Sequence, residues 1–261
     1  MKICVCVKHV PDPNFPIRVD PATRRLVRDP AHSILDPSDE YGIEAALRLV
    51  ETHGGETIAV TMGPESAIDG LRRALAMGID RAILITDAAF AGSDVGGTAR
   101  SLAAAIAAES PDLVICATES TDAYSGMVPG ALAALLDMPQ VTFARSIQIE
   151  GAIITAQRDT EAGSMTVQAS LPVLLTVTAS IAEPRYPSFK NLMAAKRKPV
   201  TRSDPAALGL AQAMVGESGA RERVLEIASV RQEKQTQKIT DDGSGDSVAQ
   251  IVAFLKRIQI V

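Results

Sequence analysis

KICVCVKHV, residues 2–10, decides the fold, because its apolar side chains occupy consecutive positions from Ile3 to Val7. Consecutive apolar positions are typical of a strand that is covered on both faces, as in a parallel sheet between two layers of helices. Three further stretches share this pattern and end in turn or polar residues: ETIAVTMG (56–63), RAILITD (81–87) and DLVICAT (112–118). The sequence therefore predicts a mostly parallel sheet.

The segments between these strands have helical periodicity. In DEYGIEAALRLVETHGG (39–55), Ile43, Ala46, Leu47 and Val50 recur at helical spacing, and a glycine pair ends the pattern. Residues 66–80, 96–110 and 126–139 predict further helices in the same way. Alternation of strand and helix with short links predicts an α/β fold in which helices cover both faces of a doubly wound sheet.

The pattern changes after Met138. Residues 143–159 and 163–180 alternate with a period of two around glycine turns, which predicts a β-hairpin region added to the sheet. From residue 206 the chain becomes polar, and SVAQIVAFLKRIQ (247–259) predicts a terminal helix. We expect an α/β domain over 1–205 and an extended arm with a helix over 206–261. Whether the arm wraps a neighbour or folds back on its own domain is left open by the pattern.

Composition excludes several classes of function. The net charge of -5 and the pI near 5.3 argue against binding to nucleic acid through its phosphates. The three cysteines have no metal-type spacing and lie in apolar runs, which indicates reduced core thiols. No signal-peptide pattern is present, and no apolar run approaches the roughly 18 to 20 residues of a membrane span. We therefore expect a cytoplasmic protein that does not insert into membranes.

The common catalytic motifs are absent. The sequence contains no Walker A loop, no GxGxxG after the first strand, no HExxH and no GxSxG. The three histidines, His9, His32 and His53, lack metal-ligand spacing, and we expect surface or capping roles for them. Nothing in the sequence predicts a self-sufficient hydrolase or transferase, or a metal site.

Polar loops follow the predicted strands at their carboxyl ends, where open parallel sheets bind ligands. Thr61–Pro64 predicts a tight turn, and Asp36, Pro37 and Asp39 form a helix-capping pattern. The loop ATESTDAYSGMVP (117–129) precedes a helix whose N-terminus could hold an anion. Its Ser, Thr and Asp residues could equally be helix caps, so a phosphate site and mere capping both stay open. Convergence of these loops at one edge favours a nucleotide site.

The segment EPRYPSFKNLMAAKRKP (183–199) concentrates basic and large apolar residues in an acidic chain. One interpretation is a solvated basic helix that turns Leu192 and Met193 into the core. The other is a recognition surface, on which exposed apolar residues contact a partner and the basic residues attract it.

Several segments, in this order along the chain, resemble the β subunit of electron transfer flavoproteins. They are VKHVPDP (7–13) with PIRVD (16–20), HSILDPSDE (32–40), TMGP (61–64) followed by LRRALAMGIDRAI (71–83), LLDMPQVTFA (135–144) and the whole of 183–199. The resemblance covers nearly all of the chain and is weakest at about residues 206–237. It implies the adenine-nucleotide α-hydrolase-like form of the α/β fold.

The resemblance implies an electron carrier subunit without substrate turnover of its own. Such a subunit pairs with an α subunit that holds most of an FAD in the crevice between the two chains. The heterodimer takes electrons from flavin dehydrogenases, such as acyl-CoA dehydrogenases in fatty acid oxidation, and passes them to a quinone reductase or another acceptor. The β subunit usually buries an AMP. Carried over by position, and with the loops above, the AMP site comprises Cys6, Asp36, Pro37, Ser38, Asp39, Met62, Gly63, Ala117, Thr118, Ser120, Thr121, Asp122, Ser125, Gly126 and Val128.

Departures from the family pattern leave alternatives open. Where typical AMP-binding members have an acidic run and Asn-Gln-Thr-Gly, this chain has TDAYSGMVP (121–129). Electron-bifurcating members place a second FAD at this site and often begin it with Thr-Asp, as Thr121-Asp122 does. A third possibility is a stand-alone adenine-nucleotide-binding module, since a shared fold does not fix function.

The resemblance also assigns residues toward partners. A family acid that lies near the α-subunit flavin maps onto Asp159. Phe189 takes the place of the usual leucine anchor for the dehydrogenase, with Leu192 and Met193 beside it. Arg185 and Tyr186 are expected to fix the base of the loop. The remaining basic residues are expected to steer acidic partners or brace the loop: Lys190, Lys196, Arg197 and Lys198.

Overall fold

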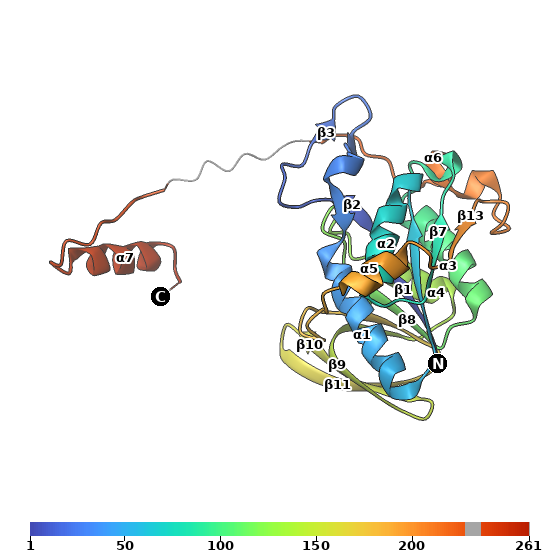
Figure 1. Ribbon diagram of the computed structural model, residues 1–261. Coiled ribbons are helices and arrows are strands. Elements are labelled where there is room, and N and C mark those ends of the chain that lie inside the picture. Colours follow the sequence, from blue (N-terminus) through green and yellow to red (C-terminus); the bar gives the residue numbers. More distant parts are fainter. Residues whose placement is uncertain (228–235, 261) are drawn as a thin grey trace. The chain divides into compact units, whose positions relative to one another are not determined.

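The computed structural model describes residues 1–227 and 236–260, which form two compact units, Met1–Leu225 and Glu226–Val261 (Figure 1). The first unit contains the sheet and six of the seven α-helices of the described residues. The second contains one helix, α7 (Asp246–Arg257). Residues 228–235, in the predicted arm, lie outside the described residues.

A nine-stranded sheet forms the centre of the first unit, in the order β11-β10-β9-β12-β8-β1-β6-β7-β13. From β9 to β13 every neighbouring pair is parallel, whereas β10 is antiparallel to β9 and to β11. The predicted mostly parallel sheet is confirmed. Its strands are β1 (Lys2–Cys6), β6 (Glu56–Met62), β7 (Arg81–Ile85), β8 (Leu113–Ala117), β9 (Gln140–Glu150), β10 (Ile153–Thr160), β11 (Gly163–Ser170), β12 (Val173–Val177) and β13 (Val200–Ser203).

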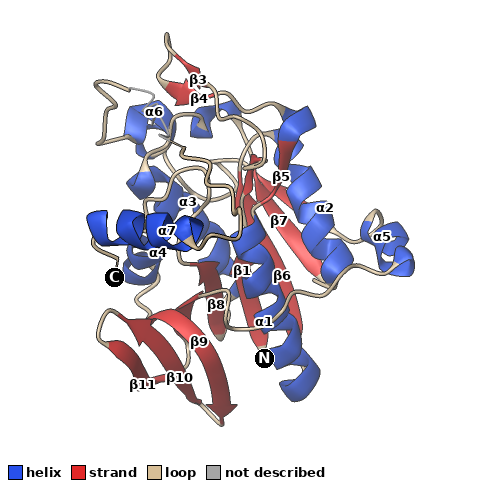
Figure 2. Cartoon of the chain, turned by 90° about the vertical axis from the view of Figure 1, so that its left-hand side faces the viewer, coloured by secondary structure: helices blue, strands red, loops and turns tan. Residues whose placement is uncertain are grey.

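Helices cover both faces of the parallel part (Figure 2). α1 (Pro37–His53) and α2 (Ile68–Met77) bury side chains against Ile3 and Val5, on one face of β1. α3 (Val95–Glu109) and α4 (Val128–Leu135) pack against Cys4 on the other face. Successive side chains of a strand point to opposite faces, so consecutive apolar residues supply both cores. The doubly wound fold predicted from KICVCVKHV is confirmed.

The strand order reverses at β1. From β1 the chain proceeds to β6 and β7 on one side, whereas β8 and β12 lie on the other side. The carboxyl ends of β1 and β8 therefore border the topological switch point, where open α/β sheets bind ligands.

The hairpin region is confirmed for β9, β10 and β11, which extend the sheet as antiparallel strands. The prediction is wrong for residues 173–177, because β12 lies between β8 and β9 and is parallel to both. All five residues of β12 are buried. VLLTV (173–177) thus has the consecutive apolar residues of a strand that is covered on both faces, and the prediction of alternating apolar and polar positions missed this.

The stretch 2–10 also differs from one continuous strand. β1 ends at Cys6, and β2 (His9–Pro11) leaves the sheet to pair with β5 (Ser33–Leu35). A second small hairpin joins β3 (Val19–Asp20) to β4 (Arg25–Leu26). The remaining short helices are α5 (Phe189–Ala195) and α6 (Gly216–Gly219), with 3-10 turns at Pro30–His32, Glu65–Ala67, Ala88–Phe90 and Gln212–Met214.

Residues 206–225, which we assigned to the arm, lie within the first compact unit. The Arg221 amide donates to Asp94, and the Arg100 guanidinium donates to the Met214 carbonyl. These contacts join the segment to the start of α3. Within 1–227 and 236–260, none of the helices is long and apolar enough to span a bilayer.

Candidate functional site

Three of the loops predicted to converge, those at Lys8, at the start of α1 and after β8, contact one another at the switch point, and Asp36 joins two of them. Asp36 caps α1 by accepting from the Ser38 amide at 3.0 Å. Its other oxygen accepts from the Thr121 amide at 2.8 Å and from the Thr121 hydroxyl at 3.1 Å. Asp36 is fully buried, so all three donors replace water around its carboxylate. The cap of α1 thus also holds the loop after β8.

A second ionic link connects this loop to the end of β1. Asp122 accepts from Lys8 Nζ at 2.7 Å and pairs with Arg28, while Lys8 Nζ also donates to Ser120 Oγ. Burial raises the pKa of Asp122, but the two cations outweigh burial and hold its pKa below the usual range. The carboxylate therefore stays ionised, although its side chain is only 2% exposed.

Asp39 lies in the first turn of α1, close to the same cluster. It is buried and accepts from the Lys8 amide at 2.7 Å. Burial raises the pKa of Asp39 well above its ordinary value, and the nearby Asp36 adds to this effect. The site thus contains two buried carboxylates of opposite behaviour. Nearby cations stabilise the charge of Asp122, whereas burial disfavours the charge of Asp39.

The start of helix α4 tests the capping interpretation of the loop 117–129. Its N-terminal position is Met127, and no side chain caps it, whereas Asp36 caps α1 and Asp94 caps α3. Ser120, Thr121 and Asp122 bind Lys8 and Asp36 instead. The helix-capping interpretation of these residues is therefore wrong, because they form hydrogen bonds and ion pairs with residues from other parts of the chain.

The end of this loop remains open. Ser125 and Gly126 are exposed, and Gly126 has a left-handed backbone with φ of 61°. Tyr124 also has positive φ and is 63% exposed. The uncapped N-terminus of α4 presents the N–H groups of Val128 and Gly130, since Pro129 has none, and the positive end of the helix dipole, which together suit an anion.

The other predicted nucleotide-site residues border this region. Cys6 and Ala117 end β1 and β8, Met62 ends β6, and Gly63 donates its amide to Ile85. A hydrogen bond with Cys116 and burial raise the pKa of the Cys6 thiol. The three cysteines form no disulfide, as predicted. Pro37 and Ser38 open α1, Thr118 starts the loop after β8, and Val128 starts α4.

Two surface hollows lie away from these loops. One, of about 280 Å³, is bordered by α1, α2 and Asn191 of α5. The other, of about 430 Å³, lies between the ends of α3 and α4. Neither contains a residue of the predicted nucleotide site. The loops at the switch point bind one another. The candidate site is therefore defined by the sheet topology and by the exposed backbone groups at the start of α4.

His9 departs from the surface or capping role that we expected. Both of its ring nitrogens are buried without a hydrogen-bond partner, and the ring packs against Gly70 of α2. Burial lowers its pKa, so the ring is neutral. His32 pairs with Asp29 at the surface, and His53 lies in the last turn of α1. In the part of the chain that the structure describes, no three His, Cys, Asp or Glu residues form a metal-binding group.

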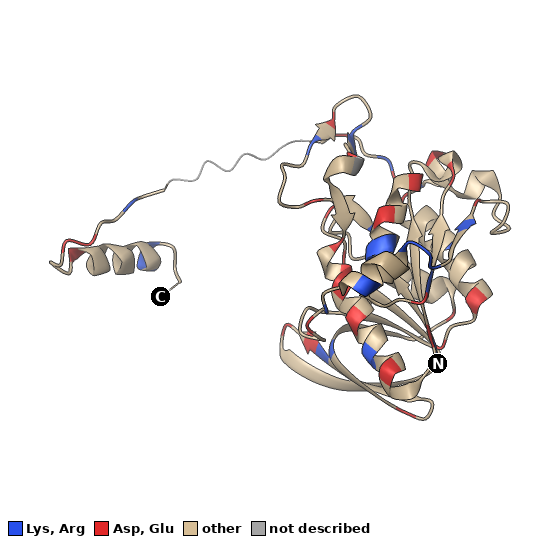
Figure 3. Cartoon of the chain, viewed as in Figure 1, with Lys and Arg blue, Asp and Glu red and all other residues tan. Residues whose placement is uncertain are grey.

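The segment 183–199 folds around α5 on the outside of α2, and Lys and Arg gather on and after it (Figure 3). Phe189 is 80% exposed, Leu192 44% and Met193 54%. The interpretation that turned Leu192 and Met193 into the core is therefore wrong. Ala195 is the buried residue of this helix. Tyr186 is 90% exposed, so its ring does not pack at the base of the loop.

The basic residues of the segment divide into two groups. Lys190, Lys196 and Arg197 are exposed. Arg185 pairs with Glu44 and Glu51 of α1, and Lys198 Nζ donates to three carbonyls at the end of α2. Sequence reasoning missed the acidic partners, although Glu44 and Glu51 lie two helical turns apart and so share one face.

Asp159 lies apart from the nucleotide-site loops. It is on β10, which β9 and β12 separate from β8. Its carboxylate is 3.4 Å from Arg145, and both side chains are close to half exposed. Asp159 therefore belongs to a different surface, on the antiparallel part of the sheet.

Comparison with known proteins agrees with the architecture. A family model described as "Electron transfer flavoprotein domain" matches residues 23–208. The chain is 38% identical to the electron transfer flavoprotein subunit beta of Mycobacterium tuberculosis (strain ATCC 25618 / H37Rv) over 265 residues, 99% of each chain. It is 34% identical to the subunit beta of Megasphaera elsdenii, with all of both chains covered. It is 35% identical to the caffeyl-CoA reductase-Etf complex subunit CarD of Acetobacterium woodii, also over all of both chains. The chain belongs to the electron transfer flavoprotein family and matches its beta subunits over its whole length.

Proposed function

We propose that this chain is the β subunit of a heterodimer that carries electrons from flavin dehydrogenases of the acyl-CoA dehydrogenase type to a quinone reductase or another acceptor. The observation that carries the proposal is the match to beta subunits over 99% of the chain. In this function the chain has no substrate turnover of its own. It binds cofactor and partners and orients them for electron transfer.

AMP is the proposed ligand at the switch point. Its phosphate would meet the open N–H groups at the start of α4, next to Ser125 and Gly126. Cys6, Met62 and Ala117 end the neighbouring strands, and Asp36 to Asp39 begin α1 beside the loop after β8. The cluster of Asp36, Thr121, Asp122 and Lys8 would hold the loop in shape around the ligand. We infer that the nucleotide is structural, because the polar side chains of this cluster bind one another.

A second FAD at this site is the alternative. Thr121-Asp122 is the feature that electron-bifurcating members often share, and one relative is named as a subunit of a caffeyl-CoA reductase-Etf complex. Such a heterodimer would contain two flavins, whereas the AMP form would contain one. The ligand count therefore separates the two forms.

The principal FAD would be held mainly by the α subunit, in the crevice between the subunits, and would accept and release the electrons. On this chain Asp159 is the residue proposed to face it. The Asp159 carboxylate is bound only loosely to Arg145, at 3.4 Å, and is 44% exposed. It is therefore available to an arginine of the α subunit.

Two surfaces are proposed to bind protein partners. Phe189, Leu192 and Met193 on α5 would enter a pocket of the dehydrogenase, because hot spots are few, large and apolar. The arm with α7 would wrap the α subunit. Within its own unit α7 leaves Val248 and Ile251 exposed, at 63% and 48%, which suits an apolar groove on another chain.

Co-expression with a candidate α subunit tests the proposal. We expect a yellow 1:1 complex that releases one FAD and one AMP when it is denatured. Release of two FAD and no AMP would establish the bifurcating form instead. A colourless β chain that stays alone and binds ATP reversibly would overturn the proposal in favour of a stand-alone nucleotide-binding module.

A further inference from the structure

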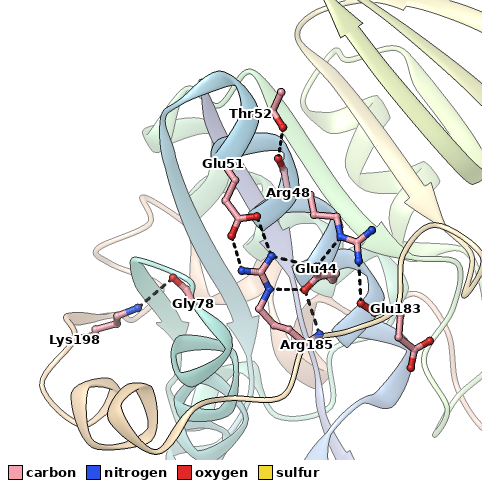
Figure 4. A network of polar contacts seen from close by, with 8 residues as sticks. All are labelled: Glu44, Arg48, Glu51, Thr52, Gly78, Glu183, Arg185 and Lys198. Carbon is pink, nitrogen blue, oxygen red and sulfur yellow. Dashed lines mark hydrogen bonds and ion pairs between the residues drawn. The ribbon is translucent and has the colours of Figure 1, made fainter.

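The two ends of the segment 183–199 are attached to the body of the protein by separate polar networks (Figure 4). Arg185 binds α1 at one end, and Lys198 binds the end of α2 at the other. Between them, α5 carries its apolar side chains on the surface. The segment is therefore held at both ends and exposes its apolar side chains between them.

The first network is centred on a buried carboxylate. The side chain of Glu44 is 3% exposed and accepts from Arg185 Nε at 2.7 Å, from Arg185 Nη2 at 3.1 Å and from the Arg185 amide at 3.2 Å. Arg48 Nε donates to the same carboxylate at 2.7 Å, and Arg48 also donates to the Glu183 carbonyl. Burial raises the pKa of Glu44, but the two arginines outweigh it and lower the pKa. Both the backbone and the side chain of residue 185 are thus fixed to α1.

The second network uses the end of a helix. Lys198 Nζ donates to the carbonyls of Leu75, Gly78 and Ile79, at 3.1, 3.2 and 2.5 Å. In return Arg72 Nη1 donates to the carbonyls of Ala195 and Lys198, at 2.6 and 2.9 Å. The ammonium thus satisfies carbonyls that helix α2 leaves without partners, at the negative end of its dipole. These reciprocal hydrogen bonds fix the end of α5 to α2.

Helix α5 could not keep this geometry by itself. It has seven residues, and isolated helices of this length are not stable in water. Only Ala195 is buried, so packing contributes little. A docking surface that must be ordered on binding loses affinity through the entropy of ordering, whereas a fixed surface does not. The two networks supply the order that α5 lacks.

We propose that Glu44, Arg185 and Lys198 are positioning residues, which hold α5 in the orientation in which Phe189 and its neighbours meet the dehydrogenase. The inference rests on the proposed docking function of α5. None of the three side chains needs to contact the partner. Their effect on electron transfer would come from the fixed geometry of residues 186–197.

The experiment uses the complete heterodimer, with an acyl-CoA dehydrogenase as electron donor. Two variants disable the networks separately: Glu44→Gln weakens the Arg185 link, and Lys198→Met removes the ammonium while keeping an apolar stem. Arg73→Met is the matched control, because Arg73 also joins α2 to α1, through an ion pair with Glu40, which lies outside the segment. Phe189→Ala reports on the docking function itself.

We expect either network variant to raise the KM of the dehydrogenase for the heterodimer about 5-fold or more, with kcat and FAD content unchanged. Amide exchange in 186–197 should accelerate, since fixed loops that lose their anchors open more often. Arg73→Met should change neither quantity. Lys198→Arg keeps the positive charge, so its KM should stay close to that of the unchanged heterodimer.

Two outcomes separate the inference from the function on which it rests. If Phe189→Ala raises KM but both network variants leave it unchanged, the positioning role is wrong and the docking role stands. If Phe189→Ala itself leaves KM unchanged, the docking role of α5 fails. A network variant that lowers thermal stability but leaves KM and segment exchange unchanged would show a purely structural role and overturn the inference.

Discussion

The loops at the switch point and the segment 183–199 use their polar residues in opposite places. At the switch point the charged side chains lie in the middle of the cluster, where Asp122 binds Lys8 and Arg28, and backbone groups are left open at its rim. In the segment the charged side chains that bind the rest of the protein, Arg185 and Lys198, lie near the ends, and apolar side chains are exposed between them. In both regions charged side chains hold the backbone, through ion pairs or hydrogen bonds, and the groups proposed for binding are ones that these side chains leave free.

The largest effect on stability is expected from removing the Asp122 carboxylate, which binds Lys8 and Arg28 at the switch point. Asp122→Ala leaves Lys8 and Arg28 without their common partner, and we expect it to lower the free energy of unfolding by about 2 to 3 kcal/mol. This is below the cost of breaking a fully buried pair, because both cations are more than a third exposed. Urea unfolding of the purified chain measures it.

Ser125→Ala is the control for this prediction, because Ser125 lies in the same loop but is exposed. Its change should stay within about 0.5 kcal/mol. Equal stability of the Asp122 and Ser125 variants would show that the Lys8–Asp122–Arg28 cluster does not hold the loop.

The next effect is expected from the middle of the segment 183–199. Phe189→Ala removes the most exposed large side chain of α5, and a hot spot of about 2 kcal/mol corresponds to a roughly 30-fold loss in kcat/KM for the dehydrogenase. The free energy of unfolding should not change, because the ring has almost no contacts to lose. Leu135→Ala, which shortens another exposed apolar side chain on α4, is the control. A normal rate for Phe189→Ala would refute the anchor assignment.

Sequence patterns were sufficient for β1, β6, β7 and β8 and for the helices between them, because an apolar period is a local property, but they misassigned β12. They were insufficient for the loop contacts. Asp36 and Thr121 are 85 positions apart, and Glu44 and Arg185 are 141 apart. Ser, Thr and Asp before α4 have the composition of a cap, and only the tertiary structure shows that Asp36 and Lys8 bind them first. The contact partners of a polar residue depend on the whole fold, whereas the spacing of apolar residues along a strand or helix can be read from the local sequence.

A smaller effect, which depends on pH, is expected at Asp39. Its pKa is raised in the folded state, so its stabilising contribution is complete below the ordinary value near 3.9 and is lost as the pH rises through the folded value. Asp39→Asn removes this loss and can still accept from the Lys8 amide. We expect the variant to gain about 1 kcal/mol over the unchanged chain at neutral pH, and less at pH 5.

Urea unfolding from pH 5 to 8 measures this difference, with the exposed Glu161→Gln as control. A stability difference that stays constant even when the series is extended down to pH 4 would contradict the raised pKa of Asp39. The same series sharpens the contrast with Asp122, whose lowered pKa keeps its contribution intact over this range and loses it only in acid.

The smallest effect is expected from the exposed charges of the segment. Lys190→Glu places a negative charge in the first turn of α5, where the helix dipole favours it, so the helix itself should not weaken. If Lys190 steers an acidic partner, the association rate with the dehydrogenase should fall about 2- to 5-fold at low salt. The difference should disappear at about 0.5 M salt, where screening acts over a few ångströms. Stopped-flow kinetics at two ionic strengths measure it, and a loss that persists at high salt would mean that Lys190 makes a direct contact. Steering and anchoring would then no longer be separable along α5, and the division of the segment into fixed ends, an apolar middle and free charges would have to be redrawn.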